Sequence, residues 1–295
     1  MKKNEIDGQT RMAAVIGNPI KHSLSPFIHN MAFEELNLNA TYLAWEVLER
    51  DMVQVLHNIR SLDMLGVNIS MPYKQLAMWY PGKLSDSAQL IGAINTIVNE
   101  KGSLKGYNTD GLGFFRNLDV KYDFQPADKN LSVIGGGGAA LAIIVEAARG
   151  KANKIQVFAR RSRSFAPLKK KLETIAELTK SDIQLFDLYQ LENMRQCLKA
   201  SDLLVNASSV GMDGLSSPVP TTGALVLPQG LLVADVIYKC LQTPFLKWAE
   251  TQGAKTENGL GMLLYQAAES FKLWTGKRMP VDLIEKKLKQ KLYDV

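Results

Sequence analysis

Residues 134–140 read IGGGGAA, a glycine run between the apolar segment LSVIG (131–135) and the helical pattern AALAIIVEAAR (139–149). The spacing Gly135-x-Gly137-x-x-Ala140 is a form of the dinucleotide-binding fingerprint, and a position between strand and helix is the context it requires. Gly135 would form the tight turn, Gly137 would let the backbone approach a pyrophosphate, and Ala140 would allow close packing of helix on strand. A flexible glycine turn is the less favoured alternative. The stretch therefore predicts a Rossmann-type unit.

Arginines follow the next predicted strand, KIQVFA (154–159), at Arg160, Arg161 and Arg163. An acidic residue there holds the ribose 2′-hydroxyl of NAD, whereas a basic residue accommodates a 2′-phosphate. Guanidinium groups can clamp phosphate oxygens in pairs and can also stack on adenine. The alternative is a solvated charge run. After this glycine loop we predict selection of NADP, with NAD the less favoured cofactor.

Strands and helices alternate on both sides of the glycine loop, which favours α/β domains with parallel sheets. Before the loop we predict strands at 11–17, 41–47 and 66–70, a helix opened by Asp51, and a hairpin over 94–108 turning near Lys101-Gly102. A helix is also predicted over 25–36, with Ser25 as N-cap and Pro26 at its first position. From the loop onward we predict strands at 131–135, 154–159, 203–208 and 231–238, and helices at 139–149, 166–178, 243–252, 261–276 and 282–292.

Composition places the chain among ordinary globular proteins: it has 295 residues, of which 46% are hydrophobic and 22% charged. No apolar run approaches the roughly 20 residues of a membrane span, and residues 1–11 lead into no signal-peptide core, so we expect a soluble, cytoplasmic protein. Cys197 and Cys240 lack a metal-ligand spacing, and we expect no metal. The net charge of +6 comes without a nucleic-acid recognition motif, so we expect neither nucleic acid nor membrane as a partner.

Polar residues gather at the predicted strand ends of the first domain, where ligands bind in open α/β sheets. Hydroxyls, amides, one lysine and one aspartate there could converge on a polyhydroxylated acid. Singly, each has an ordinary structural explanation as a helix cap, turn former or solvated side chain. The segments are Ser23-Leu24-Ser25-Pro26, Asn68 to Lys74, Asn95-Thr96, and Asn108 to Gly111.

Eight motifs occur in the order typical of the shikimate dehydrogenase family, which includes quinate/shikimate dehydrogenases, and the resemblance covers nearly the whole chain. They are GNPIKHSLSP, NISMPYK, GAINT, NTDG, IGGGGAA, NASSVGM, DVIY and NGLGMLLYQA. The resemblance implies two α/β domains, an N-terminal, mainly parallel-sheet substrate domain (1–118) and a Rossmann-type domain (119–260). C-terminal helices (261–295) would pack back on the first domain. Partners would be shikimate or 3-dehydroshikimate, with quinate as the alternative substrate, and the chain would be a monomer or homodimer.

The resemblance also implies residue roles, carried over motif by motif. Lys74 and Asp110 would be the catalytic pair. The substrate would contact Ser23 and Ser25 through its carboxylate, and Ser70, Asn95, Tyr238 and Gln266 through its hydroxyls or ring. The cofactor would contact Gly135, Gly136, Gly137, Gly138, Ala139, Arg160, Arg161, Arg163 and, beside the nicotinamide, Gly259. Three positions depart from the usual pattern: Ser70 replaces a threonine, Ala159 an asparagine, and Ser162 the ribose-binding aspartate of NAD-dependent members.

The implied activity is reversible NADP-dependent reduction of 3-dehydroshikimate to shikimate, a step toward chorismate and the aromatic amino acids. Hydride transfer to a ketone leaves negative charge on its oxygen, so the site needs a proton donor, and Lys74 can supply it. Asp110 would hold the ammonium, while oxidation of the alcohol needs a neutral amine and should be faster at alkaline pH. The alternatives are a quinate/shikimate dehydrogenase that uses NAD or NADP and, more remotely, a non-catalytic nucleotide-binding sensor.

Overall fold

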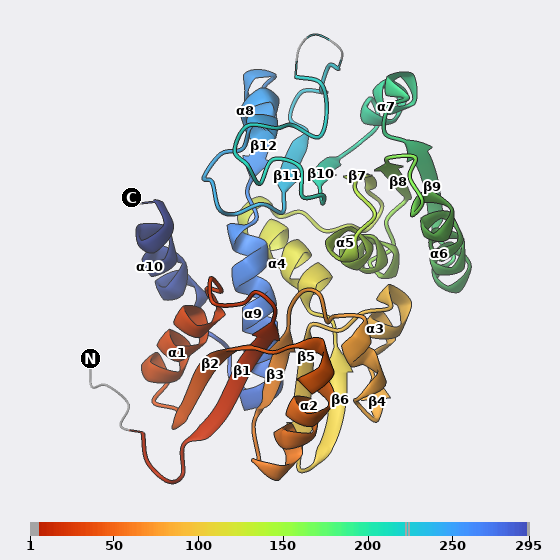
Figure 1. Ribbon diagram of the computed structural model, residues 1–295. Helices are drawn as coiled ribbons and strands as arrows, with labels where there is room; N and C mark the ends of the chain where they lie inside the picture. The colour runs from red at the N-terminus through yellow and green to blue at the C-terminus, as the bar shows by residue number, and fades with distance from the viewer. Residues whose placement is uncertain (1–5, 222, 224, 294–295) are drawn as a thin grey trace. The chain divides into compact units, whose positions relative to one another are not determined.

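The computed structural model describes residues 6–221, 223 and 225–293, and it contains two compact α/β units (Figure 1). The first unit comprises Met1–Gly113 and Leu264–Val295, and the second comprises Phe114–Leu263. Both changes of unit fall inside helices, α4 (Asp110–Tyr122) and α9 (Leu260–Thr275). The C-terminal helices therefore belong with the N-terminal sheet, as predicted. The fold confirms the expected class of two α/β domains.

The first unit contains a six-stranded sheet in the order β2-β1-β3-β5-β6-β4. Only β5 runs against its neighbours, so the sheet is mainly parallel, as predicted. The expected hairpin is β5–β6, and it turns at Lys101 and Gly102, both at positive φ. The strands are β1 (Arg11–Gly17), β2 (Ala40–Glu46), β3 (Gly66–Ile69), β4 (Lys83–Leu84), β5 (Thr96–Glu100) and β6 (Ser103–Tyr107).

The helices of the first unit cover an apolar core that includes Ile16, Met52 and Ile97. The helix α1 packs against β2 and α10, and α9 donates from the Trp274 indole to the carbonyl of Ile97 over 3.0 Å. These helices are α1 (Ser25–Glu35), α2 (Met52–Ser61), α3 (Asp86–Ile91), α10 (Val281–Tyr293) and the 3₁₀ turns η1 (Glu49–Asp51) and η2 (Leu76–Trp79).

Ser25 is not the N-cap of α1, contrary to our prediction. The chain already has helical dihedrals at Leu24, which is the N-cap, so Ser25 is the first helical residue. The hydroxyl of Ser23 accepts the Ser25 N–H over 3.2 Å, so a side chain two residues earlier satisfies this helix-terminal donor.

The second unit contains a fully parallel sheet in the order β12-β11-β10-β7-β8-β9, which is the 3-2-1-4-5-6 order of the Rossmann fold. Side chains of the strands, including Phe158, Leu204 and Val233, form one core with α7 and α8. On the sheet, α5 packs against β7 and β8, and α6 against β9. The elements are β7 (Asn130–Ile134), α5 (Gly138–Arg149), β8 (Lys154–Ala159), α6 (Phe165–Thr179), β9 (Asp182–Asp187), α7 (Leu191–Leu198), β10 (Leu203–Asn206), β11 (Leu232–Asp235), α8 (Pro244–Thr251) and β12 (Lys255–Glu257).

Two strands of the second unit end earlier than predicted, at Asn206 and Asp235. Each buried side chain accepts the backbone N–H two residues ahead, of Ser208 and Ile237, which turns the chain out of the sheet. The two side chains also bond one another, since Asn206 Nδ2 donates to Asp235 Oδ1 over 3.0 Å.

Five elements of the two units were not predicted from the sequence: β4, α3, β9, α7 and β12. In the described ranges, no helix has the length and apolar character needed to cross a bilayer.

Candidate active site

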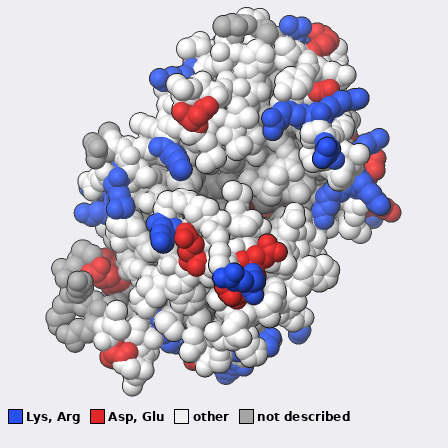
Figure 2. Space-filling model, in the orientation of Figure 1, with Lys and Arg blue, Asp and Glu red and all other residues white. Residues whose placement is uncertain are grey.

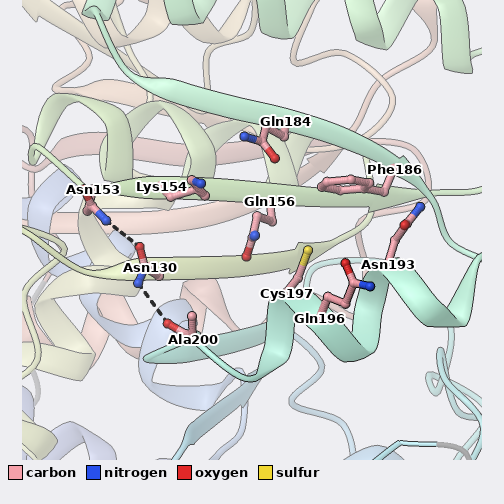
Figure 3. Close-up of a pocket in the computed structure, with 10 residues that line it drawn as sticks. All are labelled: Asn130, Asn153, Lys154, Gln156, Gln184, Phe186, Asn193, Gln196, Cys197 and Ala200. Atoms are coloured by element: carbon pink, nitrogen blue, oxygen red, sulfur yellow. Dashed lines mark hydrogen bonds between the residues drawn. The ribbon is translucent and has the colours of Figure 1, made fainter.

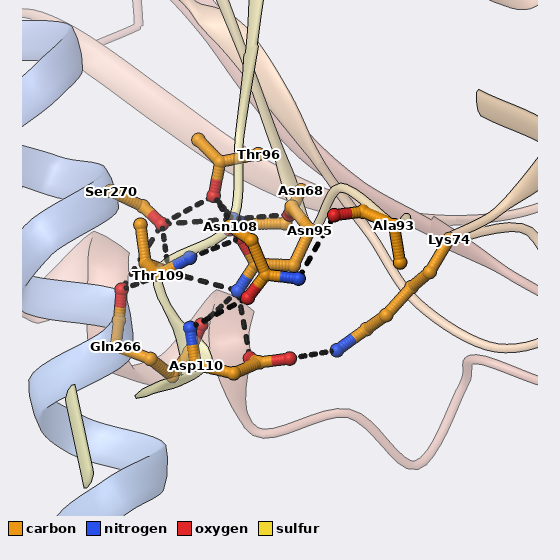
Figure 4. A network of polar contacts seen from close by, with 10 residues as sticks. All are labelled: Asn68, Lys74, Ala93, Asn95, Thr96, Asn108, Thr109, Asp110, Gln266 and Ser270. Atoms are coloured by element: carbon orange, nitrogen blue, oxygen red, sulfur yellow. Dashed lines mark hydrogen bonds and ion pairs between the residues drawn. The ribbon is translucent and has the colours of Figure 1, made fainter. Parts of the chain in front are cut away.

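Three chain segments of the first unit bring Lys74, Asn95 and Asp110 together (Figure 4). Lys74 follows β3, and its carbonyl accepts the N–H of Ile94 over 2.9 Å, which fixes the segment before β5 beside it. Asp110 is the first residue of α4, and its N–H donates to Asn108 Oδ1 over 3.1 Å. The N–H of Asn95 donates to the Tyr107 carbonyl over 2.9 Å, so backbone bonds join the Asn95 segment both to Lys74 and to the strand that leads to Asp110.

The Lys74 ammonium and the Asp110 carboxylate form an ion pair, with 2.5 Å between Nζ and Oδ2. The lysine side chain is 28% exposed and the aspartate 10%, so the carboxylate lies behind and the ammonium reaches outward. A charged pair at this distance is among the stronger hydrogen bonds in proteins. The arrangement leaves a positioned proton donor at the surface of the first unit.

Asn95 holds the far side of the Asp110 carboxylate. Its Nδ2 donates to Asp110 Oδ1 and to Thr109 Oγ1, each over 2.8 Å, and lies 3.4 Å from Gln266 Oε1. Its Oδ1 accepts the Thr109 N–H and the Thr96 hydroxyl, each over 2.9 Å. Both ends of this buried amide are thus engaged, so its orientation is fixed.

Ser270 of α9 joins this network, although the sequence reading did not identify it. Its hydroxyl lies 2.7 Å from Thr96 Oγ1, 3.3 Å from Thr109 Oγ1 and 3.1 Å from the Gln266 carbonyl. The Gln266 carbonyl also accepts from Thr109 Oγ1 over 3.0 Å. Ser270 lies four residues after Gln266, on the same face of the helix, and this spacing is the signal that could have identified it.

The network continues through Asn68 to an aromatic cluster. Asn68 Nδ2 lies 3.1 Å from Ser270 Oγ, and its Oδ1 accepts the Tyr42 hydroxyl over 2.6 Å. The Tyr42 ring stacks on His29 with 4.3 Å between centroids. His29 is fully buried, neither ring nitrogen has a hydrogen-bond partner among the described residues, and burial lowers the pKa of this imidazole to about 3. A neutral histidine therefore packs here as an aromatic residue.

The remaining residues predicted to bind substrate lie at several places in the two units. In the first unit, Ser23 and Ser25 flank the start of α1, and Ser70 directly follows β3, where its N–H donates to the Ile16 carbonyl over 2.8 Å. A Cβ on Gly17 would lie 3.1 Å from the Ser70 Cβ, so a larger residue there would push against Ser70. In the second unit, Tyr238 follows β11, and burial raises the pKa of its phenol.

The glycine loop has the conformation that its spacing predicts. Gly135 has φ +121°, and a Cβ there would lie 2.9 Å from the Ala207 carbonyl oxygen. Considering the described residues, Gly137 and Gly138 have open space where a Cβ would stand, and no side chain caps the N-terminus of α5. The open glycines and uncapped helix N-terminus fit a pyrophosphate, which would accept from backbone N–H groups there. The other loop residues assigned to the cofactor, Gly136 and Ala139, lie within the same turn and helix start.

Arg160, Arg161 and Arg163 are all exposed after the end of β8. Their guanidinium groups are therefore accessible to an anion, which fits the 2′-phosphate of NADP. Further Lys and Arg side chains lie at the right of Figure 2, where Figure 1 shows α6. Gly259, the last residue assigned to the cofactor, is buried, and a Cβ there would lie 2.0 Å from the Val236 carbonyl oxygen. No larger residue fits at that position.

A polar cavity of about 410 Å³ lies elsewhere in the second unit (Figure 3). It is lined near the starts of β7 and β8 by Asn130 and Lys154, whereas the glycine loop and the arginines follow the other ends of these strands. No residue assigned to substrate or cofactor lines it. Within the described ranges, no group of three or more His, Cys, Asp or Glu forms a metal site.

Comparison with known proteins identifies the family. Residues 15–97 match the shikimate dehydrogenase substrate binding domain, and residues 259–289 match the shikimate 5′-dehydrogenase C-terminal domain. A shikimate dehydrogenase (NADP(+)) of Lactococcus lactis subsp. cremoris is 56% identical over 280 residues, which is 95% of this chain and 97% of the relative. The chain belongs to the shikimate dehydrogenase family.

Solved structures of family members have the same fold. The shikimate 5-dehydrogenase of Listeria monocytogenes, in complex with shikimate and NAD, has a TM-score of 0.91 at 40% identity, over 96% of this chain and 98% of that one. The Thermus thermophilus enzyme, in complex with NADP(H) and shikimate, has a TM-score of 0.81 at 31% identity, over 96% and 100% of the two chains. Membership thus extends over nearly the whole chain, including the segment between the two matched domains.

Proposed function

We propose that the chain catalyses the reversible, NADP-dependent reduction of 3-dehydroshikimate to shikimate, a step in aromatic amino-acid biosynthesis. The single observation that carries the proposal is the Lys74–Asp110 pair, held at 2.5 Å with the ammonium outward. The L. lactis relative is an NADP-dependent shikimate dehydrogenase, and the T. thermophilus relative binds shikimate with NADP(H). In this assignment the domain predicted as 1–118 with 261–295 binds the substrate, and 119–260 binds the cofactor.

The cofactor, when bound, would supply the hydride as NADPH in the reduction and accept it as NADP⁺ in the oxidation, while the protein supplies the proton and the orientation. In the reduction Lys74 Nζ donates a proton to the carbonyl oxygen, and in the oxidation it takes the proton back. Asp110 holds Nζ through Oδ2, and Asn95 holds Asp110 through Oδ1, so the donor is already oriented before substrate arrives. Preorganisation of this kind removes an ordering cost from the chemical step.

Hydroxyl groups of the first unit would bind the substrate. The Ser23 oxygen accepts the Ser25 N–H and still has its own O–H to donate to a carboxylate. Ser25, Ser70 and Gln266 add polar groups of the same unit, and a contact with Tyr238 stays a prediction. Asn95 contributes chiefly by fixing Asp110, because its amide hydrogens already have acceptors at 2.8 Å. Gly135 to Ala139, with Arg160, Arg161, Arg163 and Gly259, would bind the cofactor.

Initial rates with shikimate or quinate, each with NADP or NAD, test the proposal. We expect the highest kcat/KM with shikimate and NADP, because the arginines provide partners for a 2′-phosphate that NAD lacks. A higher kcat/KM with quinate would overturn the substrate assignment, and a higher value with NAD would overturn the cofactor assignment. The pair with NAD is a necessary arm, since the L. monocytogenes relative was solved with NAD. A cytoplasmic location and a monomeric or homodimeric state stay predictions.

A further inference from the structure

Asp187 lies beside the arginines, at a position that the sequence reading did not consider. It is the last residue of β9 and pairs in register with Ala159, the last residue of β8. The N–H of Leu188 donates to the Ala159 carbonyl over 2.9 Å, which fixes the two strand ends together. A carboxylate is therefore held next to the start of the arginine segment.

The Asp187 carboxylate is fixed and makes an ion pair with Arg161. Its Oδ1 accepts the Tyr189 N–H over 3.0 Å, and its Oδ2 lies 3.5 Å from Arg161 Nε. The aspartate side chain is only 16% exposed, whereas that of Arg161 is 71% exposed. The guanidinium also lies over the Phe165 ring, 5.7 Å from its centroid. Asp187 is thus the fixed member of the pair, and Arg161 is the outer one.

Arg161 differs from the two neighbouring arginines because it pairs with a carboxylate. Among the described residues, neither Arg160 nor Arg163 makes an ion pair. The carboxylate lies on the Nε side of the Arg161 guanidinium, one of the sides on which a phosphate can pair with it, and a phosphate near Arg161 would also approach a like charge. The same carboxylate bears no such relation to a ribose 2′-hydroxyl, which is uncharged. Its effect should therefore depend on whether the cofactor carries a 2′-phosphate.

We infer that Asp187 moderates the preference for NADP over NAD, because its carboxylate competes with the 2′-phosphate for Arg161. The inference rests on the proposed use of NADP. Asp187 acts here through Arg161 and has no part in the proton transfer.

Calorimetric titration with adenosine 2′,5′-bisphosphate and with 5′-AMP tests the inference without requiring catalysis. Asp187→Asn keeps the acceptor for the Tyr189 N–H and removes the charge. We expect it to tighten adenosine 2′,5′-bisphosphate about two- to fivefold, the range for a partly exposed ion pair, and to leave 5′-AMP unchanged within twofold. Asp182→Asn is the matched control: it removes the same charge at the other end of β9, where Asp182 pairs with Lys154, and should change neither ligand.

Arg161→Gln supplies the decisive background. If Asp187 competes for Arg161, Asp187→Asn should give no further gain in that variant. A gain that persists there, an unchanged or weaker affinity in Asp187→Asn alone, or an equal gain with 5′-AMP would each overturn the inference. A wild-type protein that binds adenosine 2′,5′-bisphosphate no better than 5′-AMP would overturn the NADP assignment itself, together with this inference. A wild-type protein that binds adenosine 2′,5′-bisphosphate better than 5′-AMP, together with any of the first three results, would overturn only the inference about Asp187.

Discussion

Replacing Lys74 by methionine is the most direct test of the proposed chemistry. The variant keeps most of the side-chain volume and removes the ammonium that lies 2.5 Å from Asp110. If Lys74 is the proton donor and acceptor, kcat should fall by roughly 10²–10⁴-fold, the range for general acid–base catalysis. This loss corresponds to about 3–5 kcal/mol of activation free energy. Affinity for NADP should barely change, and shikimate binding should weaken only somewhat.

The structure also sets the stability cost of Lys74→Met and provides a control for it. Asp110 keeps its bond from Asn95 at 2.8 Å but loses a charged partner, which should lower the unfolding free energy by about 1–3 kcal/mol. Lys121 pairs with Glu257 at 2.7 Å with nearly the same exposures, 27% and 9% against 28% and 10%. Lys121→Met should therefore lose similar stability while kcat stays near the wild-type value.

Steady-state kinetics and thermal melting of both variants separate the two effects. Asp110→Asn should lower kcat in the same direction, and the double variant with Lys74→Met should be little worse than the worse single one, because the pair acts as a unit. A Lys74→Met enzyme with near-normal kcat and a raised KM for shikimate would refute the reasoning, since Lys74 would then be a binding residue.

Three further predictions follow from charges elsewhere in the chain. Neutralising Arg160 and Arg161 together should raise KM for NADP at least tenfold and far more than KM for NAD. Equal increases in KM for both cofactors would mean that the arginines act only by stacking on adenine or by stabilising the fold. Burial raises the pKa of Asp235 from 3.8 to about 6, so its contribution to the unfolding free energy should decrease by about 2 kcal/mol as pH rises from 3.8 to 6. Asp235→Asn should remove this slope in urea titrations across pH, and an unchanged slope would contradict the assignment. The pH dependence due to His29 has the opposite sign, because burial lowers the pKa of this imidazole: the unfolding free energy should decrease by about 2 kcal/mol as pH falls from 6.5 to 5. His29→Phe should abolish this decrease, and an identical acid sensitivity in the variant would exclude His29 as its source.

The parts of the fold predicted from sequence are those with strong local signals. The glycine loop combines a fixed spacing with strand and helix on either side, and the structure has Gly135 at positive φ as expected. The hairpin at Lys101-Gly102 was equally local. By contrast, β9 carries polar residues at Asp182 and Gln184 and lies at the edge of its sheet, so its apolar pattern is weak. Missing β9 is also why Asp187 went unnoticed beside the arginines.

The candidate site likewise contains residues that local motifs identify and residues that only the structure reveals. Motifs identified Lys74 and Asp110, and the structure brings them into contact. Ser270 bonds to groups more than 160 residues away in the chain, and no local pattern reports such a distance. His29 lies on the buried face of α1, and its imidazole has no hydrogen-bond partner within the described part of the chain, whereas hydrophobic spacing alone predicts an apolar residue there. Long-range polar contacts of this kind depend on how the helices return to the sheet.

The first unit is made of two stretches of chain, and this affects the order in which a ribosome completes it. Residues up to Gly113 emerge early, but Gln266, Ser270 and Trp274 emerge only after Phe114–Leu263, which takes roughly 8–30 s at about 5–20 residues per second. During that interval the nascent Thr96 and Thr109 lack their partners on α9, while the nucleotide-binding unit can already fold. A chain released before α9 is made would therefore keep the glycine loop and lack Gln266 and Ser270, so an incomplete product would have the predicted cofactor loop without the complete polar network of the first unit.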